Sequence, residues 1–104
     1  MKPVSAARLS PAIRRAIDKD IEQRRIQADR AAADGLFQTL TPRERQVLAH
    51  LVTGRLNKQI AGHLGTVEKT IKVHRGRVMK KLQVRNMAEL VRFMLRLEKL
   101  PAAF

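Results

Sequence analysis

The sequence predicts an all-α protein with one long helix followed by four shorter helices. Apolar residues recur at spacings of three and four, and no segment shows the two-residue alternation of a strand. Residues that favour helix starts and glycines that favour helix ends divide this pattern into separate helices. With 104 residues, the chain is long enough for one small core and an extension.

The first helix is expected over residues 10–33. Ser10 can cap it, Pro11 suits the first helical position, and Gly35 can adopt the left-handed conformation that ends a helix. Its first half carries an apolar stripe at every fourth position, formed by Leu9, Ile13, Ile17 and Ile21. The second half is polar and rich in alanine, which is typical of a solvated connector. The stripe is too short for a full coiled coil, and a short dimer contact through the isoleucines remains an alternative.

The second helix is expected to begin after Thr41. The segment Thr41-Pro42-Arg43-Glu44 matches a capping box with proline at the first helical position. Gly54 is expected to end this helix. Its inner stripe would consist of Val47, Leu48, Leu51 and Val52.

The third helix is expected to run from Asn57, as its cap, to Leu64. Gly65 and Thr66 predict a tight turn into a further helix over residues 68–82. Two short helices joined by a glycine turn, the second of them basic, predict a helix-turn-helix.

The helix over residues 68–82 has two contrasting faces. At about 100° per residue, one face collects Ile71, Val78 and Leu82, with His74 and Arg75 beside them. The opposite face collects Lys69, Lys72, Val73, Gly76 and Lys80. Lysines can meet phosphates or guanines and a small apolar group can meet a thymine methyl group, so this face suits a DNA groove. An ordinary amphipathic helix with a solvated lysine face is the alternative.

The last helix follows Asn86, where Asn86 and Glu89 again match a capping box. Its apolar residues spread over roughly 200° of the helix, which is more than one small core needs to cover. They are Met87, Leu90, Val91, Phe93, Met94, Leu95 and Leu97. A two-fold homodimer is one expected use of the excess surface. Packing against residues 9–21, or against a preceding domain, is the alternative.

The net charge of the chain limits the classes of partner that it is expected to bind. The net charge is +13, from 22 basic and 9 acidic residues, so a polyanion is expected. Nucleic acid is favoured over a membrane surface, because the sequence has no span-length apolar run and no signal peptide, and a cytoplasmic location is expected. Only three aromatic residues, all phenylalanine, are available for stacking on single strands, which favours duplex DNA.

Catalysis and metal binding are not expected. The chain has no cysteine, and its three histidines, His50, His63 and His74, lack the pairing of a zinc site. The acidic residues are dispersed, and no nucleophile, base and oxyanion set or phosphate-binding glycine loop can be assembled. The sequence predicts neither an enzyme nor a cofactor.

Residues 40–93 resemble the LuxR/FixJ-type DNA-binding domain of bacterial two-component response regulators. The motifs LTPRERQVL, NKQIA, TIKVHR and AELVR occur in the order and spacing of that family. The resemblance implies a tetrahelical helix-turn-helix domain whose third helix enters the major groove and whose fourth helix forms a dimer interface.

The resemblance also implies roles for individual residues. The base-reading positions of the family correspond to Lys72, Val73 and Gly76, so the third position lacks a side chain. The phosphate-binding positions correspond to Lys58, Lys69, Thr70 and Arg75, with Arg77 as a further candidate. The dimer interface would include Leu90, Val91 and Met94. Val67 stands where many members have a capping serine, and Thr66 is expected to cap instead.

A weaker resemblance lies at the N-terminus. Lys2-Pro3-Val4, with the apolar positions that follow, is similar to the end of a receiver domain, where a Lys-Pro pair precedes the last helix. It implies that residues 1–36 are a receiver-terminal or linker segment and residues 37–104 the DNA-binding domain. Lys2 would match the receiver lysine that contacts the phosphoryl group, but the acidic pocket is absent, so the chain is expected not to accept a phosphate itself. A chance match of this short segment is the alternative.

The sequence therefore predicts a sequence-specific regulator of transcription that binds double-stranded DNA as a homodimer. An intact response regulator and RNA polymerase are further candidate partners. The alternative is a protein-interaction module that dimerises with an intact regulator and modulates it without reading DNA alone.

Overall fold

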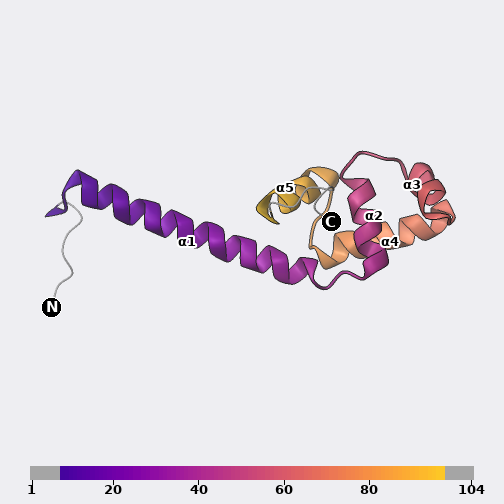
Figure 1. Ribbon diagram of the computed structural model, residues 1–104, viewed down its shortest axis with the longest axis horizontal. Helices are drawn as coiled ribbons and strands as arrows, with labels where there is room; N and C mark the ends of the chain where they lie inside the picture. Colours follow the sequence, from indigo (N-terminus) through magenta and orange to yellow (C-terminus); the bar gives the residue numbers. More distant parts are fainter. Residues whose placement is uncertain (1–7, 98–104) are drawn as a thin grey trace.

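The computed structural model describes residues 8–97. In that range it contains five α-helices and no strand, which confirms the all-α prediction. They are α1 (Pro11–Phe37), α2 (Pro42–Leu51), α3 (Asn57–Leu64), α4 (Glu68–Lys81) and α5 (Met87–Leu97). The molecule is elongated, 65 × 24 × 20 Å, because α1 projects from a body formed by α2, α3, α4 and α5 (Figure 1).

The helix α1 begins as expected but ends later. The Ile13 N–H donates to Ser10 Oγ at 3.2 Å, so Ser10 is the cap. The helix continues through Gly35, which does not adopt a positive φ, and the expected end at residue 33 is wrong. Ala33 and Phe37 are one turn apart and both are buried. Continuing the helix keeps Phe37 in the core, and this burial outweighs the low helix propensity of one glycine.

The two halves of α1 have different environments. Ile13, Ile17 and Ile21 are exposed, so the alternative in which residues 9–21 pack against the last helix is wrong. The second half, expected to be a solvated connector, contacts α5 instead. Ile26 and Leu95 line one shallow pocket between the two helices. The last three turns of α1 are therefore part of the body.

The helix α2 confirms the capping box. Thr41 Oγ1 accepts from the Glu44 N–H at 3.1 Å, and Glu44 Oε1 accepts from the Thr41 N–H at 2.9 Å. The helix ends at Leu51, and Gly54 lies in the turn beyond it with a φ of +83°. Val47 and Leu48 are completely buried on its inner side.

The turn between α3 and α4 is as expected, but the helix starts are not. Gly65 is left-handed with a φ of +66°, and the Thr66 N–H donates to the Ala61 carbonyl at 2.9 Å. Asn57 is the first helical residue rather than the cap. The cap is Leu56, whose backbone is still extended, with a ψ of 154°. The cap of α4 is Val67, which has no side-chain acceptor, so the expected cap at Thr66 is wrong.

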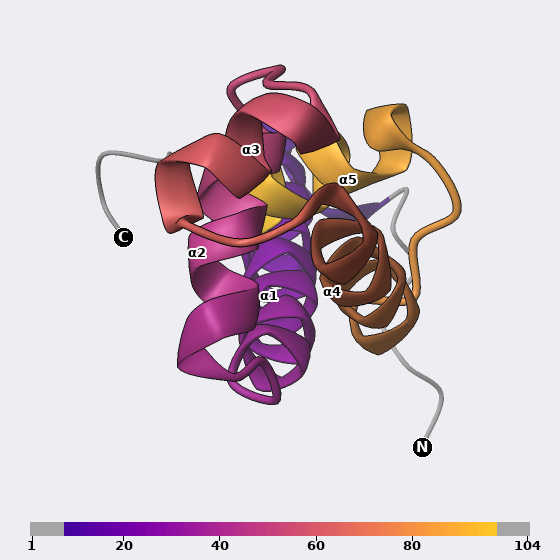
Figure 2. The ribbon, with the colours of Figure 1, turned by 90° about the vertical axis from the view of Figure 1, so that its right-hand side faces the viewer.

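The core lies where α4 packs between α2 and α3. Ile71 and Val78 on α4 have no exposed surface, which confirms the inner face predicted from periodicity. Viewed from the end remote from the start of α1, α3 crosses the outer end of the body beside α4, with α5 behind (Figure 2). This packing fixes which side of α4 points outward.

A partly buried ion pair joins α4 to the start of α2. Lys81 Nζ lies 2.6 Å from Glu44 Oε1 and 3.3 Å from the Thr39 carbonyl oxygen. Glu44 is the one charged side chain that is buried within residues 8–97. Burial raises the pKa of its carboxyl, but the hydrogen bonds from Lys81 and Thr41 outweigh burial and lower the pKa overall. Glu44 therefore stays ionised and both caps α2 and holds the end of α4.

Only one of the two hydrogen bonds of the expected capping box forms at the start of α5. The Glu89 N–H donates to Asn86 Oδ1 at 2.9 Å, as expected. The Glu89 carboxylate does not return to Asn86, because it accepts from Arg85 Nε at 3.0 Å and from the Arg85 N–H at 3.3 Å. The arginine competes successfully as a charged donor.

Candidate nucleic-acid interface

The outer face of α4 carries exposed cations without internal partners. Lys69, Lys72, Arg77 and Lys80 are all exposed. None of the four side chains makes a hydrogen bond or an ion pair with another residue in the range 8–97. Lys81, one residue further along, is paired with Glu44 instead. The unpaired cations are free to bind phosphates of an external polyanion.

The three expected base-reading positions lie together on this face. Lys72 and Gly76 are exposed, and Val73 is 47% exposed although it is apolar. The opposite side of α4 is sealed by Ile71 and Val78. The helix therefore presents a cation, a small apolar side chain and a gap in fixed positions.

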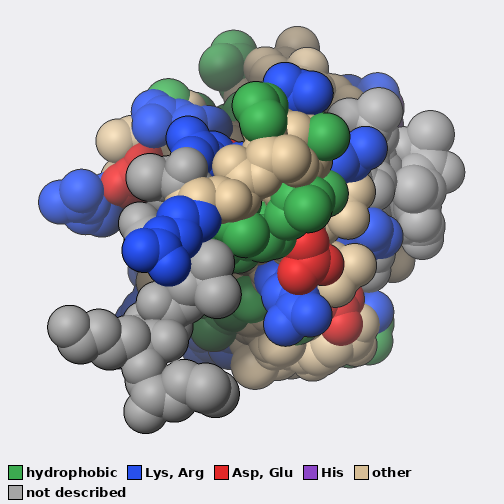
Figure 3. All heavy atoms as spheres, turned by 90° about the vertical axis from the view of Figure 1, so that its left-hand side faces the viewer, with side chains coloured by type: hydrophobic (Ala, Val, Ile, Leu, Met, Phe, Trp, Pro, Cys, Tyr) green, Lys and Arg blue, Asp and Glu red, His purple; other side chains and the backbone are tan. Residues whose placement is uncertain are grey.

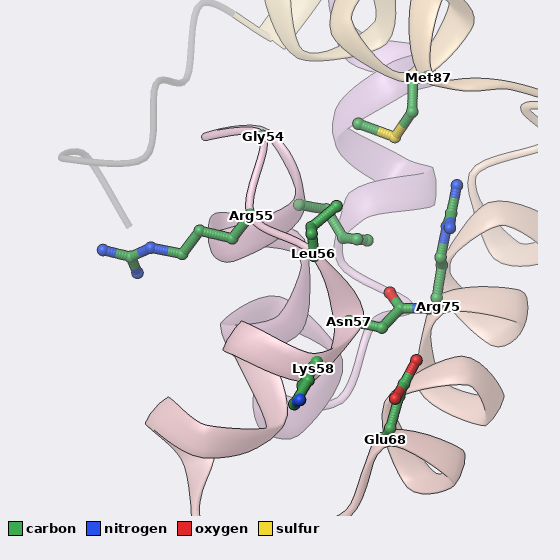
Figure 4. A pocket seen from close by; sticks show the side chains of 9 residues that line it. Gly54, Arg55, Leu56, Asn57, Lys58, Glu68, Arg75 and Met87 are labelled. Atoms are coloured by element: carbon green, nitrogen blue, oxygen red, sulfur yellow. The ribbon is translucent and has the colours of Figure 1, made fainter.

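The expected phosphate-binding residues do not all lie on α4. Lys58 is exposed at the start of α3, whereas Thr70 and Arg75 are half-buried. Lys58 and Arg75 line the same pocket of about 470 Å³, between the start of α3, α4 and Met87. Figure 4 shows the Arg75 side chain rising along α4 towards Met87.

The same pocket contains polar groups that sequence reasoning missed. Asn57 and Glu68 both line it, Asn57 from the first turn of α3 and Glu68 from the first turn of α4. In Figure 4 both side chains lie next to Arg75. A carboxylate is favoured in the first turn of a helix, which gives Glu68 a local reason to stand there. It also places one negative charge beside the expected phosphate-binding residues.

Arg43 holds α3 and is not a free cation. Its Nη2 donates to the Leu64 carbonyl oxygen at 3.1 Å, and its Nη1 donates to Gln46 Oε1 at 3.0 Å. Leu64 is the last residue of α3, just before the Gly65 turn. Arg43 therefore ties the start of α2 to the turn that leads into α4. Leu64 is 21 residues from Arg43 in the sequence, and no local sequence pattern predicts this hydrogen bond.

Gly76 is not required by packing or by backbone conformation. A Cβ added there would meet no atom within 4 Å, and its φ is not positive. Glycine inside a helix destabilises it relative to alanine. Gly76 therefore lowers the stability of α4, and no contact within the described residues requires it.

Gly76→Ala is expected to raise the free energy of unfolding by about 0.5–1 kcal/mol, because alanine favours the helix and meets open space. Urea denaturation followed by circular dichroism measures this change. Gly54→Ala is the matched control, since Gly54 also has open space but a φ of +83°, and it should destabilise the protein. A destabilising effect at Gly76 would contradict the assignment.

His50 and His63 lie on different helices, as expected, yet their rings are stacked. The ring centroids are 5.4 Å apart with planes 20° apart. Arg55 Nη1 also contacts His50 Nδ1. Burial lowers the pKa of His50, and the charges of Arg55 and His63 lower it further. No group of three or more potential metal ligands occurs in the described part of the chain.

Stability is expected to fall as the pH drops below the ordinary histidine pKa of 6.5. The pKa of His50 is lowered in the folded protein, so the unfolded chain takes up this proton at a higher pH. The contribution is complete above pH 6.5 and declines as the pH falls through the folded pKa. Thermal unfolding at pH 5 and pH 7.5 tests this, with His50→Gln as the variant that should show a smaller dependence.

The expected dimer residues have different environments. Leu90 and Met94 are buried in the core of their own chain, so they offer no side-chain surface to a second copy. Val91 is exposed, and so is Leu95 one turn later. Of the three residues, only Val91 is accessible. A dimer through α5 stays a prediction.

The chain is similar to known bacterial regulatory proteins. The profile of the bacterial regulatory proteins, luxR family, matches residues 38–94. Nodulation protein W of Bradyrhizobium diazoefficiens is 42% identical over 91 residues, which are 88% of this chain and 40% of that protein. The transcriptional regulatory protein FixJ of Azorhizobium caulinodans is 38% identical over 94 residues, which are 90% of this chain and 44% of that protein.

Two solved structures share the fold. The response regulator StyR superposes with a TM-score of 0.75 at 41% identity, covering 91% of this chain and 48% of StyR. Full-length FixJ from B. japonicum gives a TM-score of 0.70 at 35% identity, covering 93% of this chain and 48% of FixJ. The chain thus spans less than half the length of these relatives. Both the expected family and the expected fold are confirmed. Within residues 8–97, no helix combines the length and apolarity needed to cross a bilayer.

Proposed function

This chain belongs to the luxR family of bacterial regulatory proteins, and on that basis we propose that it regulates transcription by binding a specific sequence of double-stranded DNA through α4. The observation that carries the proposal is the outward face of α4. Exposed, unpaired lysines flank the exposed Val73 there, while Ile71 and Val78 hold the opposite face in the core. A surface of unpaired lysines around an exposed valine is better suited to contact a DNA major groove than to remain exposed to solvent.

The proposal assigns distinct roles to the surface residues. Lys72 and Val73 read base edges, and Gly76 leaves the third position empty. Phosphates are bound by Lys58, Lys69, Thr70, Arg75 and Arg77. These contacts supply most of the affinity, because phosphate neutralisation releases counterions irrespective of sequence.

The domain organisation and partners follow as part of the same proposal. Residues 1–36 act as a receiver-terminal or linker segment, and residues 37–104 form the DNA-binding domain. Lys2, Pro3 and Val4, which carry the receiver resemblance, lie outside the described residues. The protein works in the cytoplasm as a homodimer on paired half-sites, with RNA polymerase or an intact response regulator as a further partner. The family is a family of regulators and not a class of enzymes.

Selection of bound duplexes from a random pool tests the function. A repeat of short half-sites is expected among the selected sequences, because a two-fold dimer reads paired sites. A pool that stays random while the protein retains all duplexes equally would contradict sequence-specific binding.

Lys58→Ala is expected to weaken binding equally on specific and random duplexes and to reduce the salt dependence. Removing one phosphate contact lowers the slope of log K against log salt by about 0.9. Affinity measured at several salt concentrations tests this. An unchanged slope would remove Lys58 from the phosphate-binding set.

A further inference from the structure

The outer face of α1 carries exposed isoleucines in its first half and is not covered by another described element. Ile13, Ile17 and Ile21 are 52%, 43% and 60% exposed. At about 100° per residue, these three side chains point roughly 180° away from Ala33 and Phe37, which anchor α1 to the body. The body therefore cannot fold back to cover them. Figure 3, viewed from the N-terminal side of α1, shows apolar side chains at the surface between basic and acidic ones.

The same face continues into the second half of α1 with small residues. Ala28, Ala31 and Gly35 follow the isoleucines around the same side of the helix, and all three are exposed. A Cβ added at Gly35 would meet nothing within 4 Å, so no other described element lies over this end. The face thus has large side chains at one end and small ones at the other.

Charges lie at the middle of this face. Asp20 and Arg24 fall on the same side as the isoleucines and form an ion pair at 3.0 Å. Asp18 lies at one edge of the face. Arg25 lies at the same edge but pairs with Glu22 at 2.5 Å and with Asp29 at 3.3 Å in its own chain. Asp18 and Asp20 both precede residue 22, which is close to the centre of the exposed face, and both arginines follow it.

We propose that this face binds the same face of a second copy of the chain, with the two α1 helices antiparallel and centred near residue 22. In this register Ile13 packs on Ala31 of the second copy, large against small. Asp20 meets Arg24 of the second copy. A parallel pair would instead place Arg24 beside Arg24 and Asp20 beside Asp20, and like charges in contact are unfavourable.

The antiparallel pair differs in geometry from a dimer that reads adjacent half-sites. At 1.5 Å per residue, the two Phe37 residues are about 45 Å apart along the axis. The bodies lie at opposite ends, with each α4 beyond its Phe37 (Figure 1). Adjacent half-sites are only about 34–36 Å apart. The α1 pair therefore holds two DNA-binding bodies apart, on a surface that contains none of the DNA-binding residues.

Engineered cysteines test the orientation, because the chain has none of its own. Under mild oxidation, a mixture of Ile13→Cys and Ala31→Cys chains is expected to form a mixed disulfide-linked dimer, identified by its mass. Each variant alone should form far less, since residue 13 does not meet residue 13 in the antiparallel pair. Efficient linking of Ile13→Cys to itself would overturn the proposed orientation, and absence of any linking would overturn the pairing.

Sedimentation velocity tests the surface itself. Ile17→Glu is expected to raise the dimer dissociation constant at least about tenfold, because it buries a charge in place of a large apolar side chain. Ile26→Glu is the matched control, since Ile26 is also exposed but lies on the opposite side of α1. Equal effects of the two variants, or a wild-type chain that is monomeric at high concentration, would overturn the proposal. The Ile17→Glu variant should still bind a DNA duplex that contains a single half-site. A failure of the proposed dimer can therefore be distinguished from a failure of the proposed DNA binding.

Discussion

Lys81→Met is expected to lower the free energy of unfolding by about 2–4 kcal/mol. Breaking a buried ion pair from one side leaves a charge without a partner, which costs about 3–5 kcal/mol when both groups are buried. The side chain of Lys81 is 35% exposed, which reduces the expected cost to about 2–4 kcal/mol. Methionine keeps the aliphatic packing of the lysine stem. Urea denaturation at neutral pH measures the loss.

The neighbouring lysine provides the control for this prediction. Lys80→Met removes an exposed, unpaired charge and should change stability by no more than about 0.5 kcal/mol. Adding Glu44→Gln to Lys81→Met should recover part of the loss, because the buried charge disappears with its partner. Similar effects of Lys80→Met and Lys81→Met would show that the pair contributes little.

Lys72→Ala is expected to weaken binding to the selected operator by about 1–3 kcal/mol, with a much smaller loss on random duplexes. Lys72 is exposed on the outer face of α4, next to Val73, and has no partner among the described residues. A lysine that reads a base edge loses that contact only on the correct sequence. Competition binding at one fixed salt concentration measures both losses.

Lys69→Ala is the matched comparison, since Lys69 is exposed on the same helix and is assigned to a phosphate. It should lower the affinity for operator and random duplexes alike. An equal loss on both duplexes for Lys72→Ala would reassign Lys72 to a phosphate. Gly76→Lys would then show whether the empty position can be made to read a base.

The sequence predicted correctly those parts of the fold that depend only on residues close together in the chain. The capping box at Thr41 and the left-handed turn at Gly65 depend on neighbouring residues, and both are present. The end of α1 was wrong because burial of Phe37 is a tertiary effect. The Glu89 cap was half wrong because Arg85 competes for the carboxylate.

The candidate site divides in the same way. Periodicity alone placed Lys69 and Lys72 on the outer face of α4, whereas Lys58 and Thr70 were selected only by family resemblance. The contacts that orient α4 could not be predicted. Lys81 and Glu44 are 37 residues apart in sequence, and neither residue type nor spacing marks them as partners.

The continuity of α1 has a consequence for any segment joined to its N-terminus. Because the helix is unbroken from Pro11 to Phe37 and its last turns lie in the core, its two ends have a fixed rotational phase. Inserting one residue in its exposed half turns everything before it by about 100°, whereas seven residues restore the phase to within about 20°. The length of α1, counted in whole turns, therefore determines the direction in which a preceding segment faces relative to the DNA-binding body.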